Sequence, residues 1–521
     1  MAELALDNFS FQVVKKLPNL TIRKAHFTGY LVADNWDDWF KYATAFNLII
    51  VDGKGDRHDI GAVKIGKFNL VSEAYYRADP PAMFTKLDDI YFSLGQDDTY
   101  YEELNNLGTR LASHILSCLH DIVVDEPLYK RALKEDVTRR SLLRSIARST
   151  LEDQFRRIAR GDARLTPFDF SYQIPKFFGA LTNAPSLTFK VRPDSAPPTN
   201  VHVLIGRNGV GKTHILRSME RAIMDGPSRS NGRFQSGKEQ DVKEIFHRLV
   251  SVTFSAFDPF QNIKEKQDET EGIKYSYIGL QRPQTKDGKA QPPKSPHMLA
   301  RDFKKSFQAC HVLGKSRRWK EVIKVLESDP LIRDSNVTSL AYSGSDDGWE
   351  QKAQSTFNRF SSGHKIVILT ITKLVETVDE RTLVLMDEPE GYLHPPLLAA
   401  FIRAVSSLLT QRNGVGVIAT HSPVVLQEAP KSCVWKLQRS GRVVVAERPT
   451  LNTFGENIGV LTRDVFGLEV TESGFHQLIS EQVQEEQDLE DLDDYFDDEL
   501  GHEARGLGFA LIEQAKIRVG K

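Results

Sequence analysis

Short runs of apolar residues that end abruptly at polar or glycine residues dominate the middle of the chain. Three of them cover residues 201–205, 382–386 and 415–419. Continuous apolar runs of this length are typical of parallel strands that are buried on both faces. After the first run, apolar residues recur at helical spacing from Ile215 to Ile223. Alternating strand and helix patterns predict an α/β fold, with a mixed sheet flanked by helices.

The two ends of the chain have other patterns, which divide it into three units. Residues 1–164 begin with β-type runs and turn helical from about residue 81, so they predict an N-terminal α+β domain that ends in basic helices. No chemistry is evident in that domain, and its role is unknown. Residues 165–470 hold the α/β pattern, with an insertion expected at about 225–350. Residues 471–521 form an acidic C-terminal segment and a helix.

Composition favours a soluble protein of several domains. The chain has 521 residues, of which 40% are apolar and 26% are charged, and its net charge is −2. This length exceeds one compact core, and this balance excludes wholesale disorder. No run of about eighteen apolar residues occurs, so we expect no membrane span and no membrane partner. The three cysteines lie far apart without the spacing of a disulfide framework or a metal site, which favours a reducing, cytoplasmic location.

The first apolar run leads into a glycine-rich sequence that fits a phosphate-binding loop. Residues 206–213 match G-x-x-x-x-G-K-[ST] between a predicted strand and a predicted helix. Glycines let successive backbone N–H groups surround a phosphate, and the helix N-terminus adds partial positive charge. Lys212 would reach the β- and γ-phosphates, and Thr213 would offer a hydroxyl to Mg²⁺. The predicted nucleotide-binding residues of the loop are Gly206, Asn208, Gly209, Gly211, Lys212 and Thr213.

The other two runs end in polar groups that suit nucleotide hydrolysis. Asp387 and Glu388 follow residues 382–386 as a Walker B pattern, in which Asp387 holds Mg²⁺ and Glu388 orients or deprotonates the attacking water. His421 follows the third run, and we expect it near the γ-phosphate. Each run alone would more often be structural, but neighbouring parallel strands release their polar ends at one sheet edge. The motifs together predict an ATPase with bound ATP and Mg²⁺, catalytic residues Lys212, Glu388 and His421, and metal ligands Thr213 and Asp387.

A further motif between these two indicates the class of ATPase. Residues 360–365, Phe-Ser-Ser-Gly-His-Lys, resemble the L-S-G-G-Q signature and precede an apolar helical pattern. With this order of motifs, roughly residues 168–470 resemble the ABC-type P-loop heads typified by SMC, RecF and OLD-like proteins. The resemblance implies a homodimer, or a larger even-numbered homo-oligomer, that sandwiches ATP. It also implies that Ser361, Ser362 and Gly363 of one protomer contact the γ-phosphate held by the other.

The signature and the Walker B turn depart from the commonest family pattern. His364 and Lys365 stand where Gln is usual, which leaves the role of His364 open. After Glu388 the chain reads Pro-Glu-Gly-Tyr-Leu-His-Pro rather than the S-A-L-D of transporter subunits. This form is similar to the soluble ATPases of prokaryotic anti-phage systems, most of all the PtuA-like subunit of Septu and also the AriA-like subunit of PARIS. The glutamine that such heads place near Mg²⁺ would be either Gln261 or Gln281, since both follow strand patterns.

Three charged segments suggest partners. Residues 282–324 carry twelve Lys or Arg against three acids, and residues 130–164 carry eleven against five. Either could bind nucleic acid with strong salt dependence and little sequence preference, or could be a solvated face or a dock for an acidic partner. Residues 481–499 hold eleven carboxylates, whose repulsion favours a mobile tail or a partner-docking strip. The less favoured alternative is a divalent-metal site at Asp491, Asp493, Asp494, Asp497 and Asp498.

The sequence therefore predicts an ATPase that dimerises around ATP and controls an effector protein in anti-phage defence. The effector would be a separate nuclease of the HNH or toprim type, because the chain shows neither an HNH cluster nor room for a toprim unit after His421. One alternative is a RecF/SMC-like ATPase of DNA repair or maintenance, which would bind DNA itself. Another is a scaffold that binds ATP but hydrolyses little. A transporter subunit is least favoured, because residues 1–164 have no place in that pattern.

Overall fold

The computed structural model of this chain describes most of its length. The described residues are 9–17, 27–33, 42–69, 76–77, 79–144, 146, 150–161, 166–175, 185–236, 242–254, 263, 273–282, 291–312, 315–342, 348–440, 443–467, 474–483 and 488–518.

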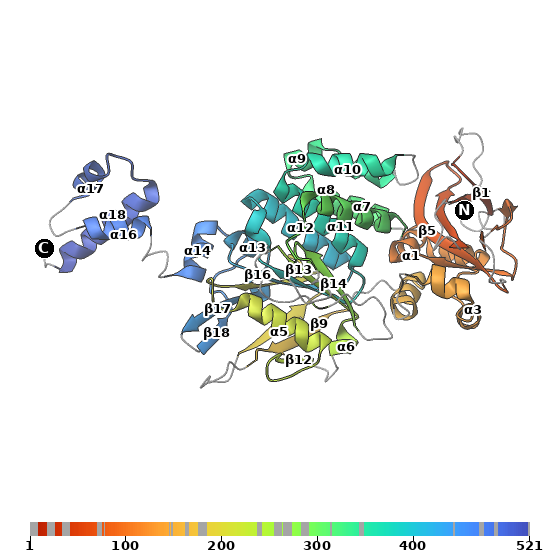
Figure 1. The fold of residues 1–521 in the computed structure, drawn as a ribbon, viewed down its shortest axis with the longest axis horizontal. Coiled ribbons are helices and arrows are strands. Elements are labelled where there is room, and N and C mark those ends of the chain that lie inside the picture. Colours follow the sequence, from red (N-terminus) through yellow and green to blue (C-terminus); the bar gives the residue numbers. More distant parts are fainter. Residues whose placement is uncertain are drawn as a thin grey trace.

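A seven-stranded sheet in the order β14-β13-β15-β16-β11-β17-β18 lies at the centre of the molecule (Figure 1). Its neighbouring strands run parallel except for the antiparallel hairpin of β17 and β18. Every residue of β11, β13, β15 and β16 is buried, as expected for parallel strands covered on both faces. The predicted α/β fold with a mixed sheet is confirmed. The strands are β11 (Val201–Ile205), β13 (Arg248–Thr253), β14 (Lys274–Gly279), β15 (Thr382–Asp387), β16 (Val415–Thr420), β17 (Val434–Ser440) and β18 (Val443–Glu447).

Helices cover one face of this sheet and form the larger hydrophobic core. Alternate strand residues such as Val384 and Met386 point into it, because successive side chains of a strand face opposite sides. The covering helices are α7 (Pro296–Val312), α8 (Ser316–Leu326), α9 (Pro330–Asp334), α10 (Trp349–Arg359), α11 (Ser362–Thr377), α12 (Pro395–Gln411) and α13 (Pro423–Gln427), with short 3-10 turns at Val337–Tyr342, Pro389–Tyr392 and Lys431–Cys433.

The other face packs against α5 (Lys212–Met224) and a small antiparallel sheet in the order β10-β9-β12. Leu383 and Leu385, which alternate with the residues above, belong to this second core. The small sheet consists of β9 (Phe168–Gln173), β10 (Ser186–Val191) and β12 (Arg233–Ser236), and α6 (Val242–Ile245) lies beside it. The phosphate loop is therefore followed by a helix that packs between two sheets.

The insertion predicted at about 225–350 needs correction. β13 and β14 fall inside that range but are strands of the central sheet, and β13 pairs directly with β15. These strands contain polar residues, for example Ser251 and Thr253 in β13. The sequence pattern therefore did not indicate that they are buried on both faces. Only the helices α7 to α10 in this range are added outside the sheet, where they cover it.

The N-terminal part has a core of its own, built on a six-stranded sheet in the order β7-β1-β2-β4-β5-β8. Two of these strands, β7 (Met83–Phe84) and β8 (Tyr91–Gly95), lie in the segment expected to be helical. The other elements are β1 (Ser10–Val14), β2 (Thr28–Ala33), β4 (Ala45–Val51), β5 (Arg57–Lys67), the pair β3 (Tyr42–Ala43) and β6 (Tyr76–Arg77), the helices α1 (Asp98–Asn106), α2 (Thr109–Cys118), α3 (Glu126–Ala132) and α4 (Arg156–Ala159), and π-helical turns at Thr138–Leu142 and Thr150–Phe155.

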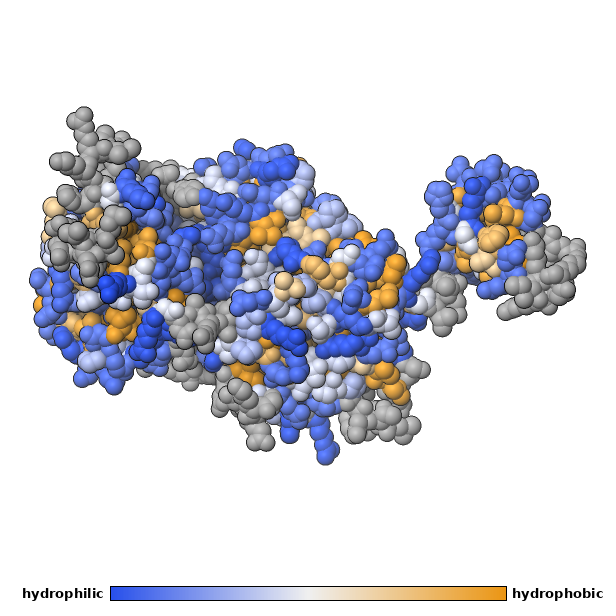
Figure 2. Space-filling view, turned by 180° about the vertical axis from the view of Figure 1, so that it is seen from behind, coloured by the Kyte–Doolittle hydropathy of each residue, from blue (hydrophilic) through white to orange (hydrophobic). Residues whose placement is uncertain are grey.

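The acidic C-terminal segment is folded where the structure describes it, so the expected mobile tail is wrong for those residues. After α14 (Ile458–Phe466) come α16 (Phe475–Gln482), α17 (Leu489–Tyr495) and α18 (His502–Arg518), which pack around Ile479, Leu492 and Ile512. Figure 1 shows this unit set apart from the central sheet, and apolar side chains are exposed on it in Figure 2. Arg505 neutralises part of the acidic charge through a 2.7 Å ion pair with Asp493.

The described residues offer no support for the metal alternative at this segment, because they contain no group of three or more His, Cys, Asp or Glu side chains placed to hold a metal ion. Among the same residues, no helix is both long and apolar enough to span a membrane.

Buried ion pairs join the N-terminal part to the helices of the central unit. Arg318 of α8, only 1% exposed, donates to Asp97 and, at 2.6 Å, to Asp98 at the start of α1. Arg412, which follows α12, pairs with Asp98 as well. Arg317, the residue before Arg318, makes a more exposed 2.8 Å pair with Glu103. The two parts are thus held by charges that water cannot screen.

We expect Arg318→Met to destabilise the folded chain by about 3–5 kcal/mol, because it leaves Asp97 and Asp98 buried with less compensating charge. Urea unfolding measures this loss. Arg317→Met is the matched control, since losing an exposed pair costs only about 0–1 kcal/mol. Equal unfolding midpoints for the two variants would contradict the assignment.

Candidate nucleotide-binding site

The loop between β11 and α5 has a backbone that requires glycine. Gly209 and Gly211 have φ angles of +80° and +101°, in the left-handed region that other residues avoid. At Gly206 an added Cβ would lie 2.4 Å from the carbonyl oxygen of Leu437 in β17. Residues 206–211 therefore curl tightly at the N-terminus of α5, where backbone N–H groups are free of helical partners and suit a phosphate.

Lys212 lies inside this loop. Its side chain donates to the carbonyl oxygens of Gly206 at 2.9 Å and Arg207 at 3.0 Å, and the residue is only 4% exposed. Burial lowers the pKa of the Lys212 ammonium, while the carboxylates of Glu388, Glu390 and Asp387 act in the opposite direction. The loop thus holds a partly desolvated cation that faces the acidic end of β15.

Thr213 and Asp387 line the same small cavity, although they are far apart in sequence. Asp387 ends β15 and is 8% exposed, so its carboxylate is fixed next to the start of α5. Hydroxyl and carboxylate oxygens are the donors that Mg²⁺ prefers, usually with several waters retained. The side chains present therefore fit a magnesium ion held by Thr213 and Asp387.

Thr253 is a member of this cavity that the sequence did not reveal. It ends β13 and is paired in register with Asp387. Its buried hydroxyl has no hydrogen-bond partner among the described residues, so it can serve a water of the metal shell. Only the pairing of β13 with β15 places Thr253 beside Asp387, and no local sequence motif encodes that pairing.

Glu388 has an unusual backbone conformation for a glutamate. Its φ is +45°, and its N–H donates to the carbonyl oxygen of Ala419 in β16 at 2.9 Å. Left-handed conformations of non-glycine residues cost of order 1–3 kcal/mol and cluster at functional sites. The contact with His421, together with the charge of Lys212, lowers the pKa of Glu388, so the residue presents an ionised carboxylate.

Glu390 positions His421, and the sequence analysis did not assign it a role. Its Oε1 accepts hydrogen bonds from the backbone N–H of His421 and the hydroxyl of Thr420, both at 2.7 Å. The same oxygen lies 3.1 Å from His421 Nδ1, whereas the nearest Glu388 oxygen is 3.9 Å away. The carboxylates of Glu388 and Glu390 raise the pKa of His421, so the imidazole keeps its proton to higher pH than usual. Glu390 could have been suspected as the third acid of Asp387-Glu388-Pro389-Glu390.

The signature residues lie elsewhere in the protomer. Ser361 and Ser362 are exposed at the N-terminus of α11, and they line neither cavity beside the phosphate loop. Gly363 allows a close approach, because an added Cβ would lie 2.6 Å from the carbonyl oxygen of Tyr392. The signature turn thus packs against the chain that follows Glu388, and it presents its two serines outward.

Of the two candidate glutamines, Gln261 lies outside the described residues. Gln281 follows β14, which is the edge strand of the sheet and is separated from β15 by β13. The chain that leaves β13 begins next to Asp387, since Thr253 and Asp387 are paired. The choice between the two glutamines stays a prediction.

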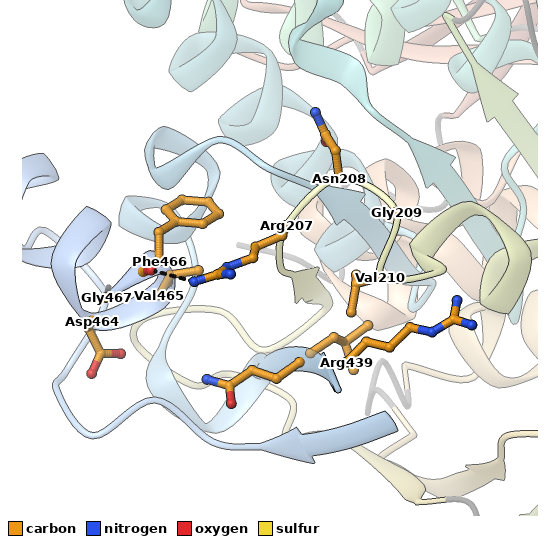
Figure 3. A pocket seen from close by; sticks show the side chains of 11 residues that line it. Arg207, Asn208, Gly209, Val210, Arg439, Asp464, Val465, Phe466 and Gly467 are labelled. Carbon is orange, nitrogen blue, oxygen red and sulfur yellow. Dashed lines mark hydrogen bonds between the residues drawn. The ribbon is translucent and has the colours of Figure 1, made fainter. Parts of the chain in front are cut away.

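A larger cavity of about 660 Å³ opens on the other side of the phosphate loop, next to β17 (Figure 3). β17 flanks β11 on the side opposite β16 and β15, so this cavity lies away from Asp387. The side chain of Arg207 reaches toward Phe466 at the end of α14 and donates to its carbonyl oxygen at 3.2 Å. The lining residues are Arg207, Asn208, Gly209, Val210, Leu437, Gln438, Arg439, Asp464, Val465, Phe466 and Gly467.

Many cations of the two basic segments are engaged in ion pairs. In residues 282–324, the pairs include Lys294–Asp302, Lys304–Glu350, Lys315–Asp379, Arg317–Glu103 and Arg318–Asp98. In residues 130–164, Arg156 pairs with Glu126 and Arg157 with Glu380. These contacts favour a structural use of much of the basic charge, and nucleic-acid binding stays a prediction.

Comparisons with known proteins place part of the chain in a described family. Residues 249–427 match the family described as "AAA domain, putative AbiEii toxin, Type IV TA system". This range includes the signature, Walker B and His421 but begins after the phosphate loop. The chain is 40% identical over 508 residues to protein Ea59 of Escherichia phage lambda, which covers 93% of this chain and 94% of that protein.

Two solved structures of ATP-binding cassettes from ABC transporters are also similar. One, in its ADP conformation, has 15% identity and a TM-score of 0.31 and covers 59% of this chain and 100% of that one. The other, free of nucleotide, has 14% identity and a TM-score of 0.27 and covers 51% of this chain and 86% of that one.

We expect Glu390→Gln to move the alkaline limb of ATP turnover to lower pH. Gln can still accept from Thr420 and the His421 N–H, but it removes a negative charge that raises the pKa of His421. The protonated imidazole would then be lost at lower pH than in the parent, so turnover should fall several-fold on the alkaline side of the profile and change little on the acidic side. A pH–rate profile measures this shift. Glu350→Gln on α10 is the control, and identical profiles for the three proteins would contradict the role of Glu390.

Proposed function

The chain belongs to the family of protein Ea59 of phage lambda, and from this premise we propose that it is an ATPase that dimerises around ATP and controls an effector protein. Residues 249–427 match an AAA domain, and the order of the phosphate loop, signature and Walker B motifs supports an ATPase domain of the ABC type. The observation that carries the proposal is the meeting of Lys212, Asp387, Glu388 and His421 at one sheet edge, while the signature serines face outward from another part of the protomer.

Hydrolysis follows from the placement of these side chains. Loop N–H groups and Lys212 bind the triphosphate, and His421 donates toward the γ-phosphate. Thr213 and Asp387 would hold Mg²⁺, which would supply charge neutralisation when bound. Glu388 accepts a proton from a water whose oxygen attacks the γ-phosphorus, and the bond to the bridging oxygen of ADP breaks in line. The lowered pKa of Glu388 keeps its carboxylate ready as the acceptor.

A second protomer would complete the site. Ser361, Ser362 and Gly363 begin a sixteen-residue helix, whose first N–H groups and exposed serines form an anion-binding surface. Because these residues line neither cavity of their own phosphate loop, we propose that they contact the γ-phosphate held by the partner copy. Bound ATP would thereby hold the two copies of a homodimer together, and hydrolysis would allow the dimer to dissociate.

The effector is proposed to be a separate protein with nuclease activity. The similarity of the D-E-P-E-x-x-L-H-P turn to PtuA-like and AriA-like ATPases supports this class of partner. We propose anti-phage defence as the setting, which is compatible with a relative encoded by a phage and with a family described as a putative AbiEii toxin of a type IV TA system. DNA maintenance by the chain itself is less favoured, because buried or partly buried ion pairs occupy much of its basic charge.

The cavity beside β17 is proposed to receive the nucleoside of ATP. Thr213 and Asp387 would hold the metal on one side of the loop, so the nucleoside end of a bound ATP would point to the opposite side, where this cavity lies. Phe466 offers an aromatic surface for a base, and Gln438 and Arg439 offer polar groups.

We expect Glu388→Gln to accumulate an ATP-bound dimer, because the glutamine no longer accepts the proton of the attacking water. Sedimentation velocity with ATP and Mg²⁺ should show the dimer, and phosphate release should fall at least about 100-fold. Lys212→Ala is the control and should stay monomeric. A Glu388→Gln protein that remains monomeric and turns over normally would refute the proposal.

The same pair of variants tests effector control. In a pull-down with ATP, Glu388→Gln should bind the nuclease protein encoded by a neighbouring gene, and Lys212→Ala should not.

We expect Phe466→Ala to raise the KM for ATP roughly 3- to 10-fold, which corresponds to one lost aromatic stacking contact. Inhibition by tripolyphosphate should not change, because that probe lacks a nucleoside. Phe454→Ala, an exposed aromatic residue that does not line the cavity, is the control. An unchanged KM in Phe466→Ala would place the nucleoside elsewhere.

A further inference from the structure

A chain of hydrogen bonds runs inward from the signature turn. The hydroxyl of Ser361 lies 2.6 Å from Nδ1 of His364, which is one helical turn further along α11. Nε2 of the same imidazole lies 3.1 Å from Oδ1 of Asp329. Ser361 is exposed, whereas His364 is 5% and Asp329 is 8% exposed. An outward hydroxyl is therefore tied to a buried imidazole and a buried carboxylate.

Asp329 is fixed by other contacts as well. It caps α9, and its Oδ1 accepts from the N–H groups of Leu331 at 2.9 Å and Ile332 at 3.2 Å. Its second oxygen lies 3.8 Å from Nε2 of His394, in the Leu-His-Pro turn after Walker B. A carboxylate with this many contacts can move little, so the imidazole that contacts it is also held in one orientation.

The surroundings of His364 restrict it further. The ring of Phe360 stacks on it with centroids 6.2 Å apart, and the ring of His394 lies 6.3 Å away. Next to it, Gly363 packs against the Tyr392 carbonyl. The signature turn is thus packed between the start of α9 and the turn that follows Glu388 and Glu390 in the same chain.

Ser, His and Asp in this order also occur in serine hydrolases, but the burial here argues against that chemistry. In such enzymes the imidazole must hand its proton to a leaving group, so it needs access to the substrate. His364 is almost fully buried beneath Phe360 and the Tyr392 turn. The buried imidazole can hold the Ser361 hydroxyl in place, but it cannot contact a substrate.

We propose that Asp329 and His364 are positioning residues that aim the Ser361 hydroxyl at the γ-phosphate of ATP bound by a second copy of this chain. The inference rests on the proposed function, because it requires the ATP-bound dimer. Fixing the serine before assembly removes the entropy cost of ordering it at the interface. It also gives a purpose to the histidine that stands where the family signature has glutamine.

A double-mutant cycle in the Glu388→Gln protein tests this inference. Sedimentation equilibrium with ATP gives the dimer Kd, and a fluorescent ATP analogue gives the affinity of the monomer for nucleotide. We expect Ser361→Ala and His364→Ala each to raise the dimer Kd roughly 10-fold and to leave the monomer affinity unchanged. The double variant should be no weaker than either single one, because both remove the same contact. Additive effects, or an unchanged dimer Kd in His364→Ala, would overturn the positioning role.

Failure of the proposed function would give a different result. In that case the parent Glu388→Gln protein would not dimerise at all, and the cycle could not begin. If the parent dimerises but His364→Ala leaves the dimer Kd unchanged, only the positioning role of His364 is wrong.

Asp329→Ser separates positioning from folding. Serine is a good N-cap, so it preserves the start of α9, but it is too short to reach His364. This variant should weaken the dimer as His364→Ala does, and it replaces that variant in the cycle if His364→Ala loses its monomer affinity for nucleotide. His476→Ala, which removes a buried histidine of the C-terminal unit, is the matched control and should leave the dimer Kd unchanged. Labelling of Ser361 by a fluorophosphonate probe would overturn the inference, since it would show that the hydroxyl is a nucleophile rather than a hydrogen-bonding partner of the phosphate.

Discussion

Parallel pairing of β11, β16, β15 and β13 is the constraint on which the nucleotide site depends. Parallel strands end at the same edge, so the phosphate loop, His421, the Walker B carboxylates and Thr253 emerge together, although some 200 residues separate the first from the last along the chain. The register is specific enough to set Thr253 directly beside Asp387. A shift of one residue would point each side chain of a strand into the opposite core, so the packing that stabilises the sheet also fixes the site.

Electrostatics gives this edge its chemical character. Lys212 is a single buried cation within reach of three carboxylates, and burial and attraction act on its pKa in opposite directions. Glu388 and His421 each stabilise the charged form of the other. Glu390 holds the loop that carries His421 by accepting from its backbone. The residues that would act on the triphosphate are thus arranged before it arrives, which is how an enzyme avoids reorganisation during reaction.

A second layer of contacts connects this edge to the rest of the molecule. The turn after Glu388 packs against Gly363 and brings His394 near Asp329, so residues 361–364 and the segment after Glu388 pack together. On the far side, Arg318 of α8 is buried against Asp98 of the N-terminal part.

The sequence by itself determined the local features: the strand, loop and helix around Lys212, the apolar strand that ends at Asp387, and the α/β class. These can be read locally because the chemistry requires adjacent residues on one strand or turn. It did not reveal that β13 belongs to the central sheet, that the acidic segment folds around Leu492, or that His364 contacts Asp329. Each of those depends on pairing or packing between distant segments, which is selected by the total burial and charge compensation of the folded chain. Only the tertiary structure could decide them.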